Sequence, residues 1–174
     1  MRLSTFFSLL VFSFQLACAQ APAVRPGIEN DKFDQRLSQL LNFSVPVMGV
    51  AELNDRQEEM LILDARPERE YAVSHIPGAR HVGYETFKLK NIKDIPKDQP
   101  IVLYCSVGYR SEKIGERLQE AGYTQVYNLY GSLFEWANRD LPLEDEAGQP
   151  TLKIHTYDRN WSQWVEEGRL EKVW

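Results

Sequence analysis

Short apolar segments and amphipathic segments alternate through the middle of this 174-residue chain. The apolar segments lack the polar–apolar alternation of half-exposed strands, which is typical of strands buried on both faces of a sheet. They lie at 60–63, 101–104 and 125–129, with a shorter extended piece at 79–82. The predicted helices that follow them span 67–73, 112–121 and 132–138. This alternation predicts an α/β fold in which helices cover both faces of a parallel sheet.

The segments on either side of this unit differ from it in composition. Residues 20–30 are small and include Pro and Gly, so we expect a tether or disordered arm. Residues 31–43 place Phe33, Leu37, Leu40 and Leu41 on one helical face, and Val-Pro-Val at 45–47 should end that helix. We therefore expect an arm and helix over 20–46, ahead of a domain at 47–143.

The C-terminal segment 144–174 begins with a polar linker and then carries three of the four tryptophans. Trp161, Trp164 and Val165 fall at helical spacing, which predicts that this tail docks on the domain. A binding role for the tail is the alternative, because exposed tryptophans are costly without a partner.

The first 19 residues have the pattern of a secretory signal peptide. Arg2 provides the positive charge, residues 6–17 provide a short apolar stretch, and Ala-Cys-Ala at 17–19 provides a cleavage site. We expect cleavage and export to a periplasmic or secreted location. The alternative is a lipoprotein signal in which Cys18 is acylated, and only then do we expect attachment to a membrane.

The formal net charge of the chain is −5, and no run of Lys or Arg occurs. This balance argues against a nucleic-acid partner. The three histidines are dispersed, so the sequence predicts no metal site.

Cys105 is the only cysteine left once Cys18 is removed or acylated, so an internal disulfide is excluded. It follows the apolar segment 101–104 and precedes a glycine-containing turn and a predicted helix. Backbone N–H groups and the helix dipole at such a place stabilise a thiolate. We therefore interpret Cys105 as a nucleophile; the alternative is an inert buried cysteine.

Three motifs in order resemble the signatures of the rhodanese (sulfurtransferase) family. They are LILDARPEREY at 61–71, HIPGA at 75–79 and CSVGYRS at 105–111, followed by Gly131, Trp136 and Leu141-Pro142 near the end of the domain. The resemblance implies a three-layer sandwich with a parallel sheet between helices. Ser132 and the Arg139-Asp140 pair replace glycines that are common in the family.

The resemblance implies sulfane-sulfur transfer without a metal or organic cofactor. Cys105 would attack a small anionic donor such as thiosulfate, become a persulfide, and pass the sulfur to a thiol or to cyanide. The loop residues that would surround its sulfur are Ser106, Val107, Gly108, Tyr109 and Arg110. Gly108 suits the curl of this loop because it tolerates positive φ.

Arg110 is the second residue that we expect to matter, because a positive charge beside the loop would attract the donor and favour the thiolate. Its alternative role is an ion pair with Glu70 or Glu112. Tyr109 is a candidate for the pocket wall.

Asp64, Arg66 and His75 are predicted near the site, mainly as scaffold. Asp64 should satisfy loop amides, and Arg66 should form an ion pair or line the cleft. His75 precedes a Pro-Gly turn and is more typical of a structural residue than of an acid–base catalyst.

Three other functions compete with sulfur transfer. Cysteine phosphatases of this fold place arginine six positions after the cysteine, whereas Arg110 lies five after Cys105, so the shorter loop favours sulfur transfer. A non-catalytic binding module with this fold would have no need of Cys105. An exported thiol-redox protein would need a resolving cysteine that the sequence lacks.

Overall fold

A computed structural model describes residues 25–174. The predicted signal peptide at 1–19, including Cys18, lies outside the described residues and stays a prediction. The helices are α1 (Asp31–Leu40), α2 (Val50–Asp55), α3 (Glu68–Val73), α4 (Tyr109–Glu120) and α5 (Ser132–Asn138). The strands are β1 (Val47–Met48), β2 (Leu61–Asp64), β3 (Arg80–His81), β4 (Ile101–Tyr104), β5 (Val126–Leu129), β6 (Lys153–His155) and β7 (Glu171–Val173). Short 3-10 helices occur at η1 (Gln57–Glu59), η2 (Leu89–Ile92) and η3 (Trp161–Trp164).

Five strands form one parallel sheet in the order β1-β5-β4-β2-β3. Strand β4 lies at the centre, and its four residues are fully buried. In a parallel sheet the carboxyl ends of all strands meet at one edge, which is where ligand sites of α/β proteins form. The α/β fold predicted from the sequence is confirmed.

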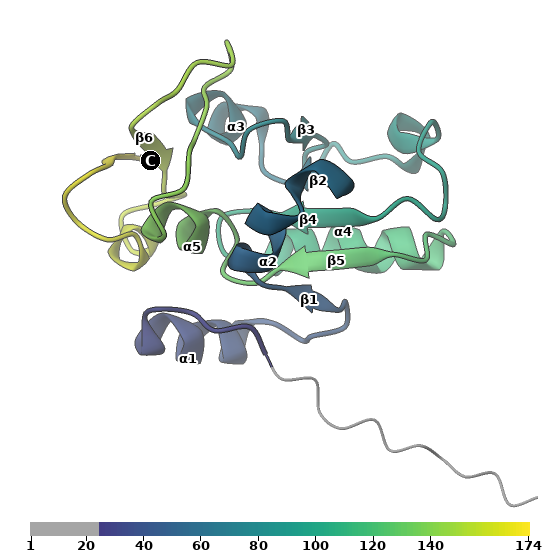
Figure 1. Ribbon diagram of the computed structural model, residues 1–174, viewed down its shortest axis with the longest axis horizontal. Coiled ribbons are helices and arrows are strands. Elements are labelled where there is room, and N and C mark those ends of the chain that lie inside the picture. The colour runs from purple at the N-terminus through teal and green to yellow at the C-terminus, as the bar shows by residue number, and fades with distance from the viewer. Residues whose placement is uncertain (1–24) are drawn as a thin grey trace, which may run out of the picture.

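The two faces of the sheet bury separate apolar clusters. Val102 and Tyr104 of β4 point to one face, where α1, α2 and α5 pack. Ile101 and Leu103 point to the other face, which α4 and the segment around η2 cover. Figure 1 shows α4 behind the sheet and α2 in front of it. Both faces are therefore apolar, which explains why the strand sequences do not alternate.

The C-terminal tail folds back over α1 and α5. Its strands β6 and β7 form a small parallel pair. Trp164 stacks on Phe33 of α1 with ring centroids 5.5 Å apart, and its carbonyl accepts a hydrogen bond from the side chain of Asn138. Both Trp161 and Trp164 pack against the cluster on the α1 side of the sheet. The turn that carries them is a 3-10 helix and not a longer α-helix.

Two predicted helix boundaries were wrong. A polar contact with a distant residue explains the first, and a special backbone conformation explains the second. Helix α1 ends at Leu40, because the N–H groups of Asn42 and Ser44 donate to the carboxylate of Glu112 instead of continuing the helix. Helix α4 begins at Tyr109, because Gly108 is left-handed and turns the chain directly into it.

Strand β1 was missed, because Pro46 reads as a break. The carbonyl of Pro46 instead accepts the N–H of Asn128, so the proline borders a short edge strand that needs no donor there. None of the helices in residues 25–174 is long and apolar enough to cross a bilayer.

Candidate active site

Cys105 lies directly after the central strand β4, at the carboxyl edge of the sheet. The chain then makes a tight loop through Ser106 and Gly108 before α4 begins. The residue is only 1% exposed, so its sulfur lies at the floor of a pocket and not on the surface.

Gly108 gives the loop its curl. Its φ is +108°, a conformation that side-chain-bearing residues rarely adopt. The carbonyl of Gly108 accepts a hydrogen bond from Asn128 Nδ2 at 3.0 Å and lies 3.1 Å from Ser111 Oγ. The hydroxyl of Ser111 has a single proton, and its shorter contact, at 2.7 Å, is with Asn128 Oδ1. These contacts turn the carbonyl away from Cys105 and leave the N–H groups of the loop facing its sulfur.

The start of α5 holds the base of the same loop. The carbonyls of Cys105 and Ser106 accept the N–H groups of Leu133 and Phe134 at 3.1 and 3.2 Å. Ser132 Oγ accepts the N–H of Cys105 at 3.3 Å. Ser132, which stands where the family often has glycine, adopts positive φ (+52°) and is fully buried. Its hydroxyl therefore ties α5 to the Cys105 backbone.

The surroundings of Cys105 favour its thiolate form. Burial by itself raises the pKa of this thiol, but the positive charge of Arg110 lowers it. Three N–H groups lower it further; they belong to Ser111, Val107 and Gly108. The Gly108 nitrogen lies 3.1 Å from Sγ. The net effect is a pKa below the ordinary cysteine value, which is typical of reactive cysteines.

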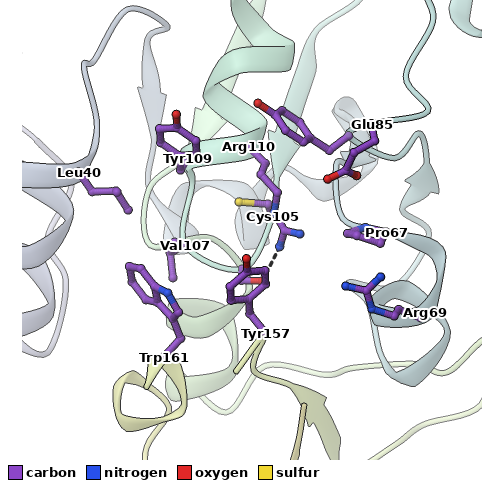
Figure 2. Close-up of a pocket in the computed structure, with 12 residues that line it drawn as sticks. Leu40, Pro67, Arg69, Glu85, Cys105, Val107, Tyr109, Arg110, Tyr157 and Trp161 are labelled. Carbon is purple, nitrogen blue, oxygen red and sulfur yellow. Dashed lines mark hydrogen bonds between the residues drawn. The ribbon is translucent and has the colours of Figure 1, made fainter. Parts of the chain in front are cut away.

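Arg110 is fixed beside the sulfur by Glu70 of α3. Its two terminal nitrogens lie 2.9 and 2.8 Å from the two carboxylate oxygens of Glu70. Arg110 also donates to Ser106 Oγ at 2.9 Å, the contact drawn in Figure 2. Glu70 is fully buried, which raises its pKa, but the hydrogen bonds and charge of Arg110, together with the charge of Arg66, lower it, and the net pKa is below its ordinary value. Of the two ion-pair partners considered for Arg110, Glu70 and Glu112, the structure has Glu70.

This pair changes the role expected of Arg110. Because Glu70 neutralises most of its charge, Arg110 offers less attraction to an anionic donor than a lone arginine would. Its position still stabilises the thiolate at short range. The exposed cation at the pocket rim is Arg69, which the sequence analysis did not single out.

Asp64 and Arg66 form a buried ion pair behind the site. Arg66 donates from Nη2 and Nε to Asp64 at 2.6 and 3.0 Å, and both side chains are fully buried. The N–H of Arg66 also donates to Asp64 Oδ1 at 2.8 Å. Arg66 Nη2 reaches the carbonyl of Ser74 at 2.6 Å. Neither residue lines the pocket around Cys105.

His75 is placed outside the pocket as well. Its Nδ1 lies 3.0 Å from the carbonyl of Tyr71, and its Nε2 lies 3.2 Å from Glu144. The ring stacks on Tyr71 with centroids 3.8 Å apart. Its backbone pairs with Glu144, so His75 joins α3 to the beginning of the tail.

The pocket above Cys105 has a volume of about 370 Å³. The loop after β4 forms its floor, and six further side chains form much of its wall: Leu40, Arg69, Tyr84, Glu85, Tyr157 and Trp161. Figure 2 shows Tyr157 and Trp161 below the sulfur, Leu40 on the α1 side, and Tyr109 above. Tyr109 therefore lies in the wall, where the sequence placed it. Of the tail residues, Trp161 was expected to dock on the domain, with a binding role as the alternative, whereas Tyr157 was not singled out.

Comparison with known proteins identifies the fold around this pocket. The sequence model of the Rhodanese-like domain matches residues 49–139, just over half of the chain. The chain belongs to the rhodanese family. The matched span contains Cys105, Arg110 and Glu70, but not Leu40, Tyr157 or Trp161.

Individual relatives agree with this assignment. A sulfurtransferase of Allochromatium vinosum is 35% identical over 91 residues, which cover 52% of this chain and 84% of that protein. A tRNA uridine(34) hydroxylase of Bartonella henselae is 34% identical over 96 residues, 52% of this chain but only 31% of that protein. The similarity to the hydroxylase thus concerns less than a third of that protein.

Among solved structures, the rhodanese-like domain of an Anabaena sp. protein has a TM-score of 0.54 at 26% identity, covering 57% of this chain and 79% of that one. Within residues 25–174 no group of three or more His, Cys, Asp or Glu side chains is arranged to hold a metal ion.

Replacing Arg110 with glutamine should move the titration of the Cys105 thiol to higher pH. The substitution removes the charge that lowers the thiol pKa and leaves Glu70 as a nearby unpaired carboxylate. The measurement is the rate of alkylation by iodoacetamide as a function of pH. Lys113→Gln, one turn further along α4, should titrate like the wild type. An unchanged midpoint in Arg110→Gln would contradict this account of the thiolate.

Proposed function

We propose that this rhodanese-family protein is a sulfurtransferase in which Cys105 carries sulfane sulfur as a persulfide. The observation that carries the proposal is the environment of Sγ, where loop N–H groups and Arg110 favour an anion at the floor of a pocket. A persulfide carries its charge close to the same groups, so the site suits both forms of the cysteine.

The reaction has two displacement steps. The Cys105 thiolate attacks the outer sulfur of thiosulfate, a new sulfur–sulfur bond forms, and sulfite leaves with the electron pair of the broken bond. An acceptor thiolate or cyanide then attacks the outer sulfur of the persulfide. The electron pair of that bond returns to Sγ, and Cys105 is again a thiolate.

The ionisation state of Cys105 and the charge at the pocket rim also support sulfur transfer. Since the Cys105 thiolate is already favoured, the first step needs no general base, and His75 lies elsewhere. Arg69 is exposed at the rim of the pocket and provides positive charge for an anionic donor. Because of this positive charge, we propose a small anionic donor such as thiosulfate.

The direct test is the covalent intermediate. After incubation with thiosulfate, the intact mass of the protein should rise by about 32 Da, the mass of one sulfur atom, with release of sulfite. Added cyanide should return the protein to its starting mass and yield thiocyanate. Hydrolysis of a phosphate ester without any sulfur uptake would instead favour a phosphatase. Failure of both reactions would favour a binding module.

A further inference from the structure

The pocket over Cys105 is completed by segments outside the matched rhodanese domain. Leu40 comes from α1, and Tyr157 and Trp161 come from the C-terminal tail. All three lie outside residues 49–139. An apolar and aromatic part of the pocket wall is therefore built by segments outside the matched domain.

Tyr157 is held over the site by specific contacts. Its ring lies near Arg110, with the guanidinium carbon 5.4 Å from the ring centroid. Its backbone N–H donates to Nδ1 of His155 at 3.1 Å, and its φ is +68°, an unusual conformation for a tyrosine. The side chain is nevertheless 50% exposed. A strained backbone that presents a large exposed ring to a pocket is consistent with a binding role.

Trp161 is a second aromatic residue of the tail in the wall of the pocket. Its backbone N–H donates to Asp158 Oδ1 at 2.9 Å, and the guanidinium carbon of Arg36 of α1 lies 5.4 Å from the centroid of its indole ring. Figure 2 shows its ring beside Val107, below the sulfur of Cys105. The backbone of Trp161 is thus fixed within the tail and its ring packs against α1, so the indole can offer a preformed flat surface to a ligand.

The size and charge of the pocket do not match a small inorganic acceptor. A cavity of about 370 Å³ lies within the range of pockets that hold organic ligands and is far larger than cyanide, the inorganic acceptor. Glu70 neutralises Arg110, and the rim carries one cation, Arg69, and one anion, Glu85. The interior therefore offers apolar contact more than net charge.

We infer that the sulfur acceptor is a low-molecular-weight thiol whose sulfur is attached to a flat apolar body, such as an aromatic ring. The ring lies against Trp161 and Tyr157 while its thiolate attacks the outer sulfur of the Cys105 persulfide. A bond forms between the two sulfur atoms, the bond to Sγ breaks, and its electron pair returns to Sγ. This inference rests on the proposed function and names the substrate class of the same site.

The experiment compares two acceptors of similar acidity. Full-length protein is loaded with sulfur from thiosulfate and mixed with phenylmethanethiol or with 2-mercaptoethanol. Loss of the persulfide is followed by intact mass, and rates are expressed per thiolate. Burial and stacking of one ring should make phenylmethanethiol about tenfold faster in the wild type.

Three variants locate the preference. In Trp161→Ala and in Tyr157→Asn, whose new residue tolerates positive φ, the ratio of the two rates should fall toward one. Trp174→Ala is the matched control, because Trp174 is an exposed tryptophan of the same tail that does not line the pocket. Its ratio should equal that of the wild type.

The outcomes separate this inference from the proposed function. If wild-type protein takes up sulfur and passes it to cyanide but shows no preference for the aromatic thiol, only the acceptor class is wrong. A preference that persists in both pocket variants would overturn the role of the tail. If no sulfur reaches Cys105 from thiosulfate, the proposed function itself fails. Should Trp161→Ala not fold, Tyr157→Asn alone decides the role of the tail.

Discussion

Cys105→Ser is expected to eliminate both the persulfide and all turnover from thiosulfate to an acceptor. Serine occupies almost the same volume, but at neutral pH its hydroxyl is not ionised and it forms no stable analogue of a persulfide. By comparison with other enzymes that lose a covalent nucleophile, the rate should fall by about 10³-fold or more. The measurements are intact mass after thiosulfate and the steady-state rate of thiocyanate formation.

The same variant should fold as the wild type does. The Cys105 backbone is held by Ser132 and Leu133, and neither contact involves the sulfur. Equal melting temperatures would assign the lost activity to the missing nucleophile. Residual sulfur transfer at the wild-type rate would show that Cys105 is not the carrier.

Asp64→Ala is expected to lower the free energy of unfolding by about 3–5 kcal/mol, because it leaves the fully buried guanidinium of Arg66 without its partner. This is a large part of the total stability of about 5–15 kcal/mol that is usual for a domain. Urea denaturation followed by circular dichroism measures the change directly.

Two comparisons test the cause of this loss. Asp94→Ala breaks the exposed ion pair with Arg80 and should cost about 1 kcal/mol or less. The double variant Asp64→Leu with Arg66→Met should be more stable than Asp64→Ala, since no unpaired charge remains buried. If Asp64→Ala lowers the free energy of unfolding no more than Asp94→Ala does, then the buried ion pair of Asp64 and Arg66 does not stabilise the fold as proposed.

The central strands could be predicted from the sequence because both faces of the sheet are covered. Each residue of β4 is buried, so the strand reads as a continuous apolar run with no competing pattern. Strand β1 could not be predicted in the same way. It is only two residues long and follows a proline, and its pairing depends on β5, which lies about 80 residues later in the chain.

The loop after β4 could also be predicted, since its conformation depends mostly on neighbouring residues. Gly108 was expected at positive φ, and it lies there with its N–H on the sulfur. The residues that hold the loop in place could not be predicted from the sequence. Asn128 and Ser132 come from β5 and α5, and nothing in their local sequence indicates a contact with the loop.

The sequence by itself predicted the α/β class and a cysteine directly after a buried strand, because these follow from local patterns of burial and turn chemistry, while three ordered motifs indicated the family by resemblance. Only the tertiary structure decided that Glu70 neutralises Arg110 and that Tyr157 and Trp161 close the pocket. These residues lie 40 to more than 50 positions from Cys105 or Arg110, and such contacts depend on how the packed elements meet in space. Residue spacing along the chain specifies strands, helices and loops, but it does not specify which distant side chains share a pocket.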